Sequence, residues 1–303
     1  MGRNPASGVS RRSFIKYSGA VGVAGALAGC GLQDGTSTDG GSPDEVVIGS
    51  NHPLSGSLSN TGERMDQAVK LAAMMKNENG GIESLDGAEV SVVSGDNEGE
   101  QELGGEVAQE LIDEGADVLT GCYSSPVTSA ATRTAESERI PFVISVSVAN
   151  SILQGTDLNY AYRPQPSARQ MGIDSANLLP QVVRDGGQEI ETAALFYIDI
   201  SFGQSIRDTL RNELPDNGVE VVAEESIGFG ETADTQVTSF RNADPDAIIA
   251  TTYRAGTIEL LSAMDNQNYR PPILAGCSNA AMNDVSALEE MGQTVEGGFG
   301  TNF

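Results

Sequence analysis

Two short stretches decide the fold: residues 117–125, Asp-Val-Leu-Thr-Gly-Cys-Tyr-Ser-Ser, and residues 273–279, Ile-Leu-Ala-Gly-Cys-Ser-Asn. Each begins as a short apolar run and ends in Gly-Cys followed by small hydroxyl or amide residues. A strand that ends this way is typical of a parallel sheet whose carboxyl edge binds ligands. The same arrangement occurs once in each half of the chain.

The first half alternates short apolar runs with longer amphipathic segments. The predicted strands cover residues 46–49, 88–94, 117–120 and 141–147, and the predicted helices cover residues 61–79, 101–114 and 125–138. In the first helix Met65, Ala68 and Ala72 recur at the helical period. Alternating strands and helices predict a parallel sheet with helices on both faces.

The second half repeats this pattern after the Pro-rich residues 163–166. The predicted strands cover residues 192–198, 219–226, 247–251 and 273–276, and the predicted helices cover residues 168–184, 202–214, 235–241, 256–267 and 280–291. The expected fold class is α/β, with two Rossmann-like lobes whose parallel sheets are flanked by helices. The expected domains are a first lobe at 44–163 and a second at 164–295, with residues 296–303 beginning a return to the first lobe.

Composition excludes several functional classes. The 43 acidic and 17 basic residues give a net charge of −26 and a pI near 4.1, which speaks against nucleic acid as a partner. One His and three Cys leave little material for a zinc site or a Ser-His-Asp centre, and no common catalytic motif is present, so we expect no cofactor, no metal and no enzyme activity. Only three basic residues are Lys, and this scarcity beside dispersed acids indicates adaptation to strong brine.

The sequence of residues 1–29 predicts an N-terminal export signal. Ser10-Arg11-Arg12-Ser13-Phe14-Ile15-Lys16 matches the twin-arginine pattern, and the apolar residues 17–28 after it are too few to span a bilayer. Leu27-Ala28-Gly29-Cys30 resembles a lipobox, so Cys30 is the predicted lipidation site. Residues 30–43 then form a flexible tether. Removal of the signal leaves 13 basic and 43 acidic residues, a charge of −30.

From residue 45 onward the chain resembles the leucine/isoleucine/valine-binding family, the type I solute-binding proteins of ABC importers. The motifs that carry the resemblance, in order, are Ile48-Gly49, Leu54-Ser55-Gly56, Gly62, Asn79-Gly80-Gly81-Ile82, Asp96, Gly121 to Ser125, Ile140-Pro141, Tyr162-Arg163, Phe202-Gly203 and Asp244-Pro245-Asp246. The resemblance implies two hinged lobes that close on a small solute. It also implies a monomer outside the cytoplasm, anchored by lipid only, which serves an ABC permease and its ATPase subunits.

The resemblance places the ligand contacts near helix starts and on aromatic walls. The matching residues of this chain are Tyr123, Ser124, Ser125, Ser145, Ser147, Phe202, Tyr253 and Ser278. In the family the first lobe holds the polar head of the ligand with hydroxyls and backbone N–H groups. The serines at 124 and 125 could equally cap the helix that follows them. His52, in the loop after the first strand, is a weaker candidate for ligand contact than for a surface or core residue.

The chain departs from the family pattern in two places. Family members that bind amino acids carry an acid after the strand at 273–276, where this chain has Cys277-Ser278-Asn279, so Asp199 or Asp284 would have to hold the ammonium. The expected ligand is a branched-chain or related amino acid, with amides or urea-like solutes, or a sensory role, as alternatives. The family also continues past the position of Phe303, so we expect the C-terminal part to be missing and apolar faces to be exposed.

Cys122 and Cys277 are an even pair once Cys30 is lipidated. A disulfide between them would lock the two lobes together, but an open cleft is wider than the roughly 7 Å between Cα atoms that a disulfide allows. Two half-buried thiols are therefore the expected state.

Overall fold

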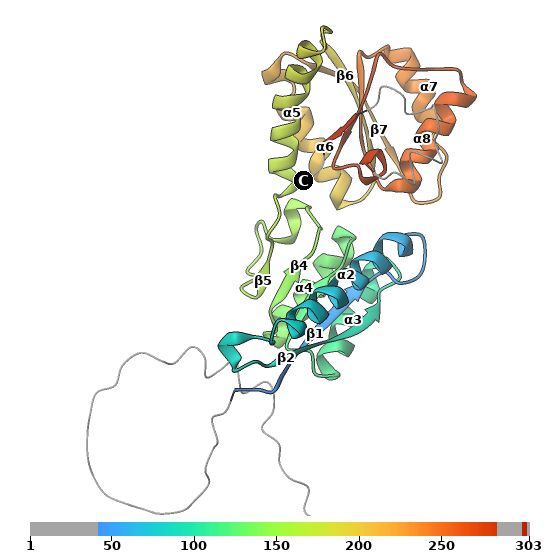
Figure 1. Cartoon of the computed structure of the whole chain (residues 1–303). Helices are drawn as coiled ribbons and strands as arrows, with labels where there is room; N and C mark the ends of the chain where they lie inside the picture. The colour runs from blue at the N-terminus through green and yellow to red at the C-terminus, as the bar shows by residue number, and fades with distance from the viewer. Residues whose placement is uncertain (1–41, 284–298, 302–303) are drawn as a thin grey trace, which may run out of the picture.

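The computed structural model describes residues 42–283 and 299–301, and these form two lobes, each built on a five-stranded parallel sheet (Figure 1). The prediction of an α/β fold with two such lobes is confirmed. In Figure 1 the first lobe lies below the second, and the chain passes between them around α5.

The first lobe has its sheet in the order β2-β1-β3-β4-β5. Its strands are β1 (Glu45–His52), β2 (Glu89–Asp96), β3 (Val118–Gly121), β4 (Phe142–Ile144) and β5 (Ala161–Tyr162), and its helices are α2 (Ser59–Glu78), α3 (Gln101–Asp113) and α4 (Ser125–Glu138), with short 3-10 helices η1 (Glu83–Leu85) and η2 (Asn150–Ile152). Helices α3 and α4 pack closely because Gly104 has no side chain, and a Cβ there would lie 2.6 Å from Val127.

The second lobe has its sheet in the order β10-β9-β8-β6-β7. Its strands are β6 (Thr192–Ile198), β7 (Glu220–Ile227), β8 (Ala247–Thr251), β9 (Ile273–Cys277) and β10 (Phe299–Thr301), and its helices are α5 (Ala168–Asp185), α6 (Ser201–Glu213), α7 (Asp234–Ala243) and α8 (Arg254–Asn266), with 3-10 helices η3 (Pro215–Asn217) and η4 (Ala280–Asn283). All residues of β8 and β9 are buried, as expected for central strands of a parallel sheet covered on both faces.

The C-terminal residues differ from the expectation at two points. Residues 299–301, expected to begin a return to the first lobe, instead pair with β9 and extend the second sheet. Of the helix expected at 280–291, only 280–283 lie among the described residues, where they form the short 3-10 helix η4. The remainder of that helix, with Asp284, lies outside the described residues, as do the signal and Cys30.

The two lobes are in direct contact. Leu58 and Val148 of the first lobe belong to the hydrophobic core of the second, and Tyr123 packs against the same core. A separate core of the first lobe lies between its sheet and helices α3 and α4, around Leu119 and Phe142. The two lobes therefore touch near the edge where their strands end.

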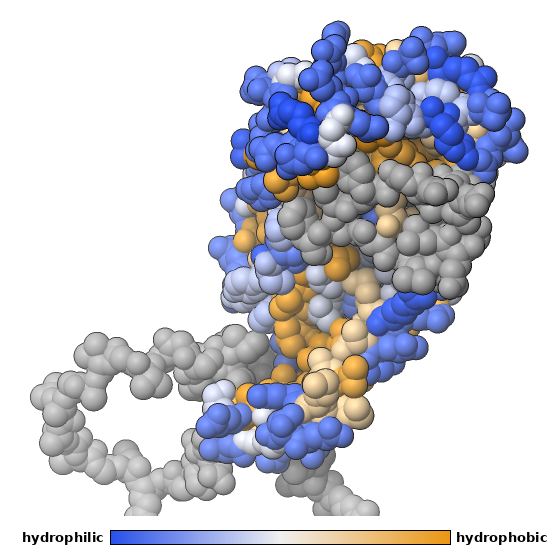
Figure 2. Space-filling view, turned by 45° about the horizontal axis from the view of Figure 1, so that its top comes forward, coloured by the Kyte–Doolittle hydropathy of each residue, from blue (hydrophilic) through white to orange (hydrophobic). Residues whose placement is uncertain are grey.

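Several large apolar side chains are exposed. They are Leu71, Met74 and Met75 of α2, Val143, Val146 and Tyr162 in and beside β4 and β5, and Leu178 and Val182 of α5, together with Phe229. Figure 2 shows apolar surface, in orange, extending along the first lobe between polar regions. None of the described helices combines the length and the apolar character needed to cross a membrane.

Candidate functional site

A cavity of about 240 Å³ lies between the lobes, at the carboxyl ends of both sheets. The first lobe lines it with the loop after β1 and the start of α2, and with Tyr123 after β3. The second lobe lines it with Ile198 at the end of β6, with residues 228–231 after β7, and with residues 252–256 and Glu259 around the start of α8. Open α/β sheets bind ligands at this edge, so the cavity is the candidate binding site.

Aromatic rings form one wall of the cavity, and Tyr253 is their centre. The ring of Tyr253 lies 5.0 Å from that of Tyr123, 5.3 Å from that of Phe202 and 5.9 Å from that of Phe229, between ring centroids. Tyr123 belongs to the first lobe and the other three to the second. Phe202 is buried behind Tyr253 and does not line the cavity, whereas Phe229 is 48% exposed.

Tyr253 also contacts the first lobe, because its ring packs against that of Tyr123. Burial raises the pKa of Tyr253 well above its usual range, and the nearby Tyr123 adds to this effect. Burial raises the pKa of Tyr123 too, against the effect of a hydrogen bond to Thr61. Both phenols are therefore neutral at physiological pH and serve as hydrogen-bonding groups.

Ser124, Ser125 and Ser147, predicted as ligand contacts, are all buried. Ser125 is buried, and its Oγ accepts a hydrogen bond of 3.4 Å from the N–H of Ala149. The Oγ of Ser147 donates to the carbonyl of Tyr123 at 3.0 Å and lies 2.5 Å from the hydroxyl of Thr128. The three serines do not line the cavity, and the hydroxyl of Ser147 holds the loop that carries Tyr123.

Two further predicted residues also lie outside the cavity lining. The hydroxyl of Ser145 is buried and has no hydrogen-bond partner among the described residues. Ser278 follows β9 with a left-handed backbone, φ 52°, and is half-buried. Of the eight predicted residues, the structure thus brings Tyr123 and Tyr253 to the cavity, with Phe202 directly behind them.

The other residues considered for the ligand also lie away from the cavity. His52 is fully buried beside Ser50, with 2.9 Å between Nδ1 and the Ser50 hydroxyl, and burial lowers its pKa to about 4. Asp199 is exposed and accepts a hydrogen bond from Gln204. Neither lines the cavity.

The two described cysteines do not form a disulfide. Cys122 is fully buried in the first lobe, and the sulfur of Cys277 lies 3.1 Å from the hydroxyl of Ser175 in the second. The expectation of two thiols is confirmed, although both are buried and not half-buried. Among the described residues, no group of His, Cys, Asp and Glu side chains is arranged to hold a metal ion.

Sequence reasoning missed most of the polar lining. The missed polar residues are Ser57, Asn60 and Thr61 in the first lobe and Glu231, Thr252, Arg254 and Glu259 in the second, and the aromatic Phe229 was missed as well. All lie in or just after loops that follow predicted strands, so the general rule for parallel sheets would have pointed to them. The spacing of the residues alone does not say which side chains in such a loop face the partner lobe.

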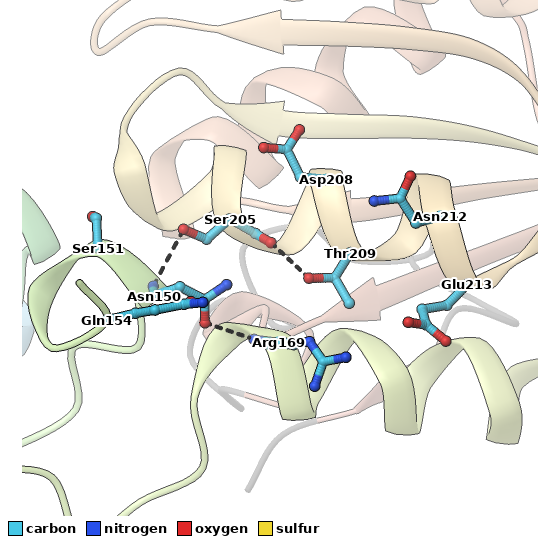
Figure 3. Close-up of a pocket in the computed structure, with 9 residues that line it drawn as sticks. All are labelled: Asn150, Ser151, Gln154, Arg169, Ser205, Asp208, Thr209, Asn212 and Glu213. Carbon is cyan, nitrogen blue, oxygen red and sulfur yellow. Dashed lines mark hydrogen bonds between the residues drawn. The ribbon is translucent and has the colours of Figure 1, made fainter.

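A second, wider hollow of about 450 Å³ lies where η2 meets α6 (Figure 3). The N–H of Asn150 donates to Ser205 Oγ at 3.4 Å, and its side chain accepts from the N–H of Arg169 at 3.1 Å. These bonds join the two lobes beside the chain crossing. The hollow is open, lies away from the carboxyl ends of the strands and lacks an aromatic wall, so the smaller cavity is the better candidate for a binding site.

Comparison with known proteins agrees with this geometry. The family model described as periplasmic binding protein matches residues 45–303, and the model of the twin-arginine translocation pathway signal sequence matches residues 8–28. A relative named Leu/Ile/Val-binding protein homolog 8, from Brucella abortus, is 27% identical over 237 residues, which is 77% of this chain and 58% of the relative. The chain thus spans little more than half the length of that relative.

Solved structures share the fold. A periplasmic binding protein type 1 from Bordetella pertussis matches with a TM-score of 0.72 at 17% identity, over 85% of this chain and 68% of that one. The branched-chain amino acid binding protein LivJ from Streptococcus pneumoniae, solved with isoleucine, matches with a TM-score of 0.67 at 21% identity, over 77% of this chain and 64% of that one. With the family model covering most of the sequence, the chain belongs to the periplasmic binding protein family.

Proposed function

We propose that this protein is the solute-binding component of an ABC importer, and that it captures a small amino acid between its two lobes. The cavity between the carboxyl ends of the two sheets carries this proposal, because loops from both lobes line it. At about 240 Å³ it is smaller than the roughly 300–1,000 Å³ of sites for drug-sized ligands, which suits a solute of amino-acid size. A relative named as a Leu/Ile/Val-binding protein homolog, and LivJ solved with isoleucine, point the same way.

The proposed setting is the outer face of the cytoplasmic membrane. The twin-arginine signal supports export, and Cys30 at the end of a lipobox is the proposed lipid anchor, with residues 30–43 as its tether. The proposed lobe boundary lies near Arg163, between β5 and α5. The monomer would deliver its solute to a permease with ATPase subunits and would carry out no reaction of its own.

Thermal unfolding with a ligand panel tests this function. The full chain would be heated in molar KCl with leucine, isoleucine, valine, leucinamide, acetamide or urea. A ligand at a hundred times its dissociation constant adds about 2.7 kcal/mol to the free energy of unfolding, which raises the midpoint by several degrees. Absence of a shift with every compound would contradict the proposed function.

A matched pair of variants locates the binding. Phe229 lines the cavity and Tyr162 does not, yet the two side chains are similarly exposed, at 48% and 55%. Phe229→Ala is expected to weaken binding at least about fivefold, because a stacked apolar contact is lost. Tyr162→Ala is expected to leave the dissociation constant unchanged, and equal effects of the two variants would place the solute elsewhere.

A further inference from the structure

Two aromatic rings stack on Tyr253, and they differ in how firmly the protein holds them. Phe202 lies 5.3 Å from Tyr253 between ring centroids, is 6% exposed and belongs to the core of the second lobe. Phe229 lies 5.9 Å from Tyr253, with 17° between the ring planes, and is 48% exposed. Phe229 and Tyr253 both line the cavity, whereas Phe202 does not. Phe229 therefore occupies stacking surface of Tyr253 at the cavity wall.

A short loop flanked by glycines presents this ring. The loop follows Ile227, the last residue of β7, and reads Gly228-Phe229-Gly230-Glu231. The N–H of Gly228 donates to the Glu231 carboxylate at 2.7 Å, and the N–H of Glu231 donates to the Gly228 carbonyl at 3.5 Å. Gly230 lies in the left-handed region with φ 75°, and a Cβ there would meet no atom within 4 Å. The loop is thus closed by its own bonds, with Phe229 at its tip.

A ring on the solute would need the surface that Phe229 occupies. Aromatic groups bind aromatic walls by stacking or by edge contacts. The ring of Tyr253 is only 8% exposed, because the other rings already pack against it. An aliphatic side chain needs no flat surface and packs against whichever apolar groups remain. The arrangement of the rings therefore favours an aliphatic solute over an aromatic one.

The rest of the apolar lining does not replace this stacking surface. Tyr123 contacts Tyr253 at 5.0 Å with a tilt of 43°, and its ring is partly buried against the core of the second lobe. Leu58 and Ile198 also line the cavity, and both are aliphatic. Tyr253 is thus the surface on which a solute ring would stack, and Phe229 is the side chain that controls access to it.

We propose that Phe229 determines the specificity of the site by closing the ring of Tyr253 to solutes that carry an aromatic ring. The bond between Glu231 and Gly228 holds the loop in the position that does this. The inference rests on the proposed function and adds to it the residue that restricts the solute to amino acids with aliphatic side chains. Removal of the Phe229 ring leaves an apolar space of ring size, and such spaces bind small aromatic molecules.

Isothermal titration calorimetry on the full chain in molar KCl, with leucine and phenylalanine as probes, tests the inference. The parent is expected to bind leucine at least about tenfold more tightly than phenylalanine, because a stacked contact is denied to the second probe. In Phe229→Ala this ratio is expected to fall by at least about tenfold. Leucine binds this variant more weakly than the parent, whereas phenylalanine binds it more tightly, since its ring takes the place of the Phe229 ring.

Matched variants separate the ring from the loop that carries it. Phe229→Tyr keeps the ring, and its ratio is expected to stay within about twofold of the parent. Glu231→Ala removes the acceptor for Gly228 N–H and is expected to shift the ratio in the same direction as Phe229→Ala. Glu231→Gln keeps an oxygen acceptor and is expected to leave the ratio unchanged. Tyr162→Ala, on β5 and outside the cavity lining, is the control for loss of an exposed ring.

Three results would overturn the inference while leaving a solute-binding function intact. The first is phenylalanine binding the parent as tightly as leucine does. The second is Phe229→Ala weakening both probes by the same factor, which would make Phe229 an unselective part of the wall. The third is a parent that binds acetamide or urea but no amino acid. An unchanged ratio in Glu231→Ala would overturn the role of the loop bond alone. If no compound of the thermal panel binds the folded parent, the proposed function itself fails.

Discussion

At the scale of single residues, His52 couples the stability of the first lobe to pH. It lies at the end of β1 with no exposed surface, its Nδ1 is bonded to Ser50, and its Nε2 has no partner among the described residues. Desolvation lowers the pKa of His52 from 6.5 to about 4, and the nearby Asp66 opposes this only in part. The imidazole is therefore neutral in the folded protein at pH 5 to 7.

The free energy of unfolding is expected to fall by about 3 kcal/mol between pH 6.5 and pH 4 on account of His52. In this range the unfolded chain binds a proton at His52 and the folded chain does not, so stability is complete above pH 6.5 and declines as the pH falls toward 4. Urea unfolding at several pH values would measure the decline.

His52→Gln is the matching variant, because an amide keeps polar atoms at this position and does not titrate. Its free energy of unfolding should change less with pH than that of the parent between pH 6.5 and 4. The pKa values of Asp66 and Asp96 are also lowered, so their protonation reduces stability only at lower pH, and equally in the parent and in the variant. Parallel curves for parent and variant from pH 7 to 4 would show that His52 is solvated and would contradict the prediction.

Prediction of individual site residues from sequence was limited by contacts between the lobes. Tyr123 and Tyr253 could be predicted, because each comes directly after a strand whose carboxyl end faces the cleft. Ser125 and Ser147 also follow strands, but they face inward and bond to Ala149 N–H and to the Tyr123 carbonyl. Thr252 was missed because its neighbour Tyr253 carries the stronger sequence signal, and the packing of Thr252 against Gly256 depends on the start of α8.

At the scale of elements, the long segments were predictable and the short ones were not. Helices such as α2 and α3 and strands such as β6 and β8 lie within a few residues of their predicted bounds, because apolar periodicity continues over many residues in each. Strand β5 has two residues, one of which, Tyr162, is exposed, so no pattern marks it. Strand β10 forms by pairing with β9, a contact that the local sequence does not encode.

Two neighbouring glycines of α3 give a test of helix packing. A Cβ at Gly104 would lie 2.6 Å from both the Cγ1 and the carbonyl oxygen of Val127 in α4, whereas a Cβ at Gly105 would meet first the Thr134 hydroxyl, at 3.1 Å. Gly104→Ala is expected to lower the free energy of unfolding by about 1–3 kcal/mol, because α3 and α4 must move apart. Urea or thermal unfolding measures this change.

Gly105→Ala is the internal control for this prediction. It gains helix propensity of about 0.5–1 kcal/mol, and the Thr134 side chain can rotate away from the new methyl group. Its stability is therefore expected to match or exceed that of the parent. A stable Gly104→Ala variant would mean that α3 and α4 are less closely packed than in this structure.

At the scale of the whole molecule, charge dominates the surface. The chain has 43 acidic and 17 basic residues, so most carboxylates have no basic residue with which to pair. The described ion pairs, such as Lys70 with Asp66 and Arg207 with Glu224, engage only a few of them. Repulsion among the remaining carboxylates opposes the compact state at low ionic strength.

Salt is therefore expected to stabilise the folded chain strongly. The Debye length falls from about 10 Å at 0.1 M to about 3 Å at 1 M, so repulsion between separated carboxylates is almost fully screened in molar KCl. Relief of about 2 kcal/mol would raise the midpoint of thermal unfolding by about 4–8 °C for a protein of this size. Thermal unfolding in 0.1 M and 2 M KCl measures the shift. Sorbitol at the same osmolality is the control, because it is excluded from the protein surface but does not screen charge. If the midpoint rises equally in sorbitol, or does not rise in KCl, the surface is not adapted to brine. If it rises in KCl alone, the stabilisation comes from screening of the excess carboxylates.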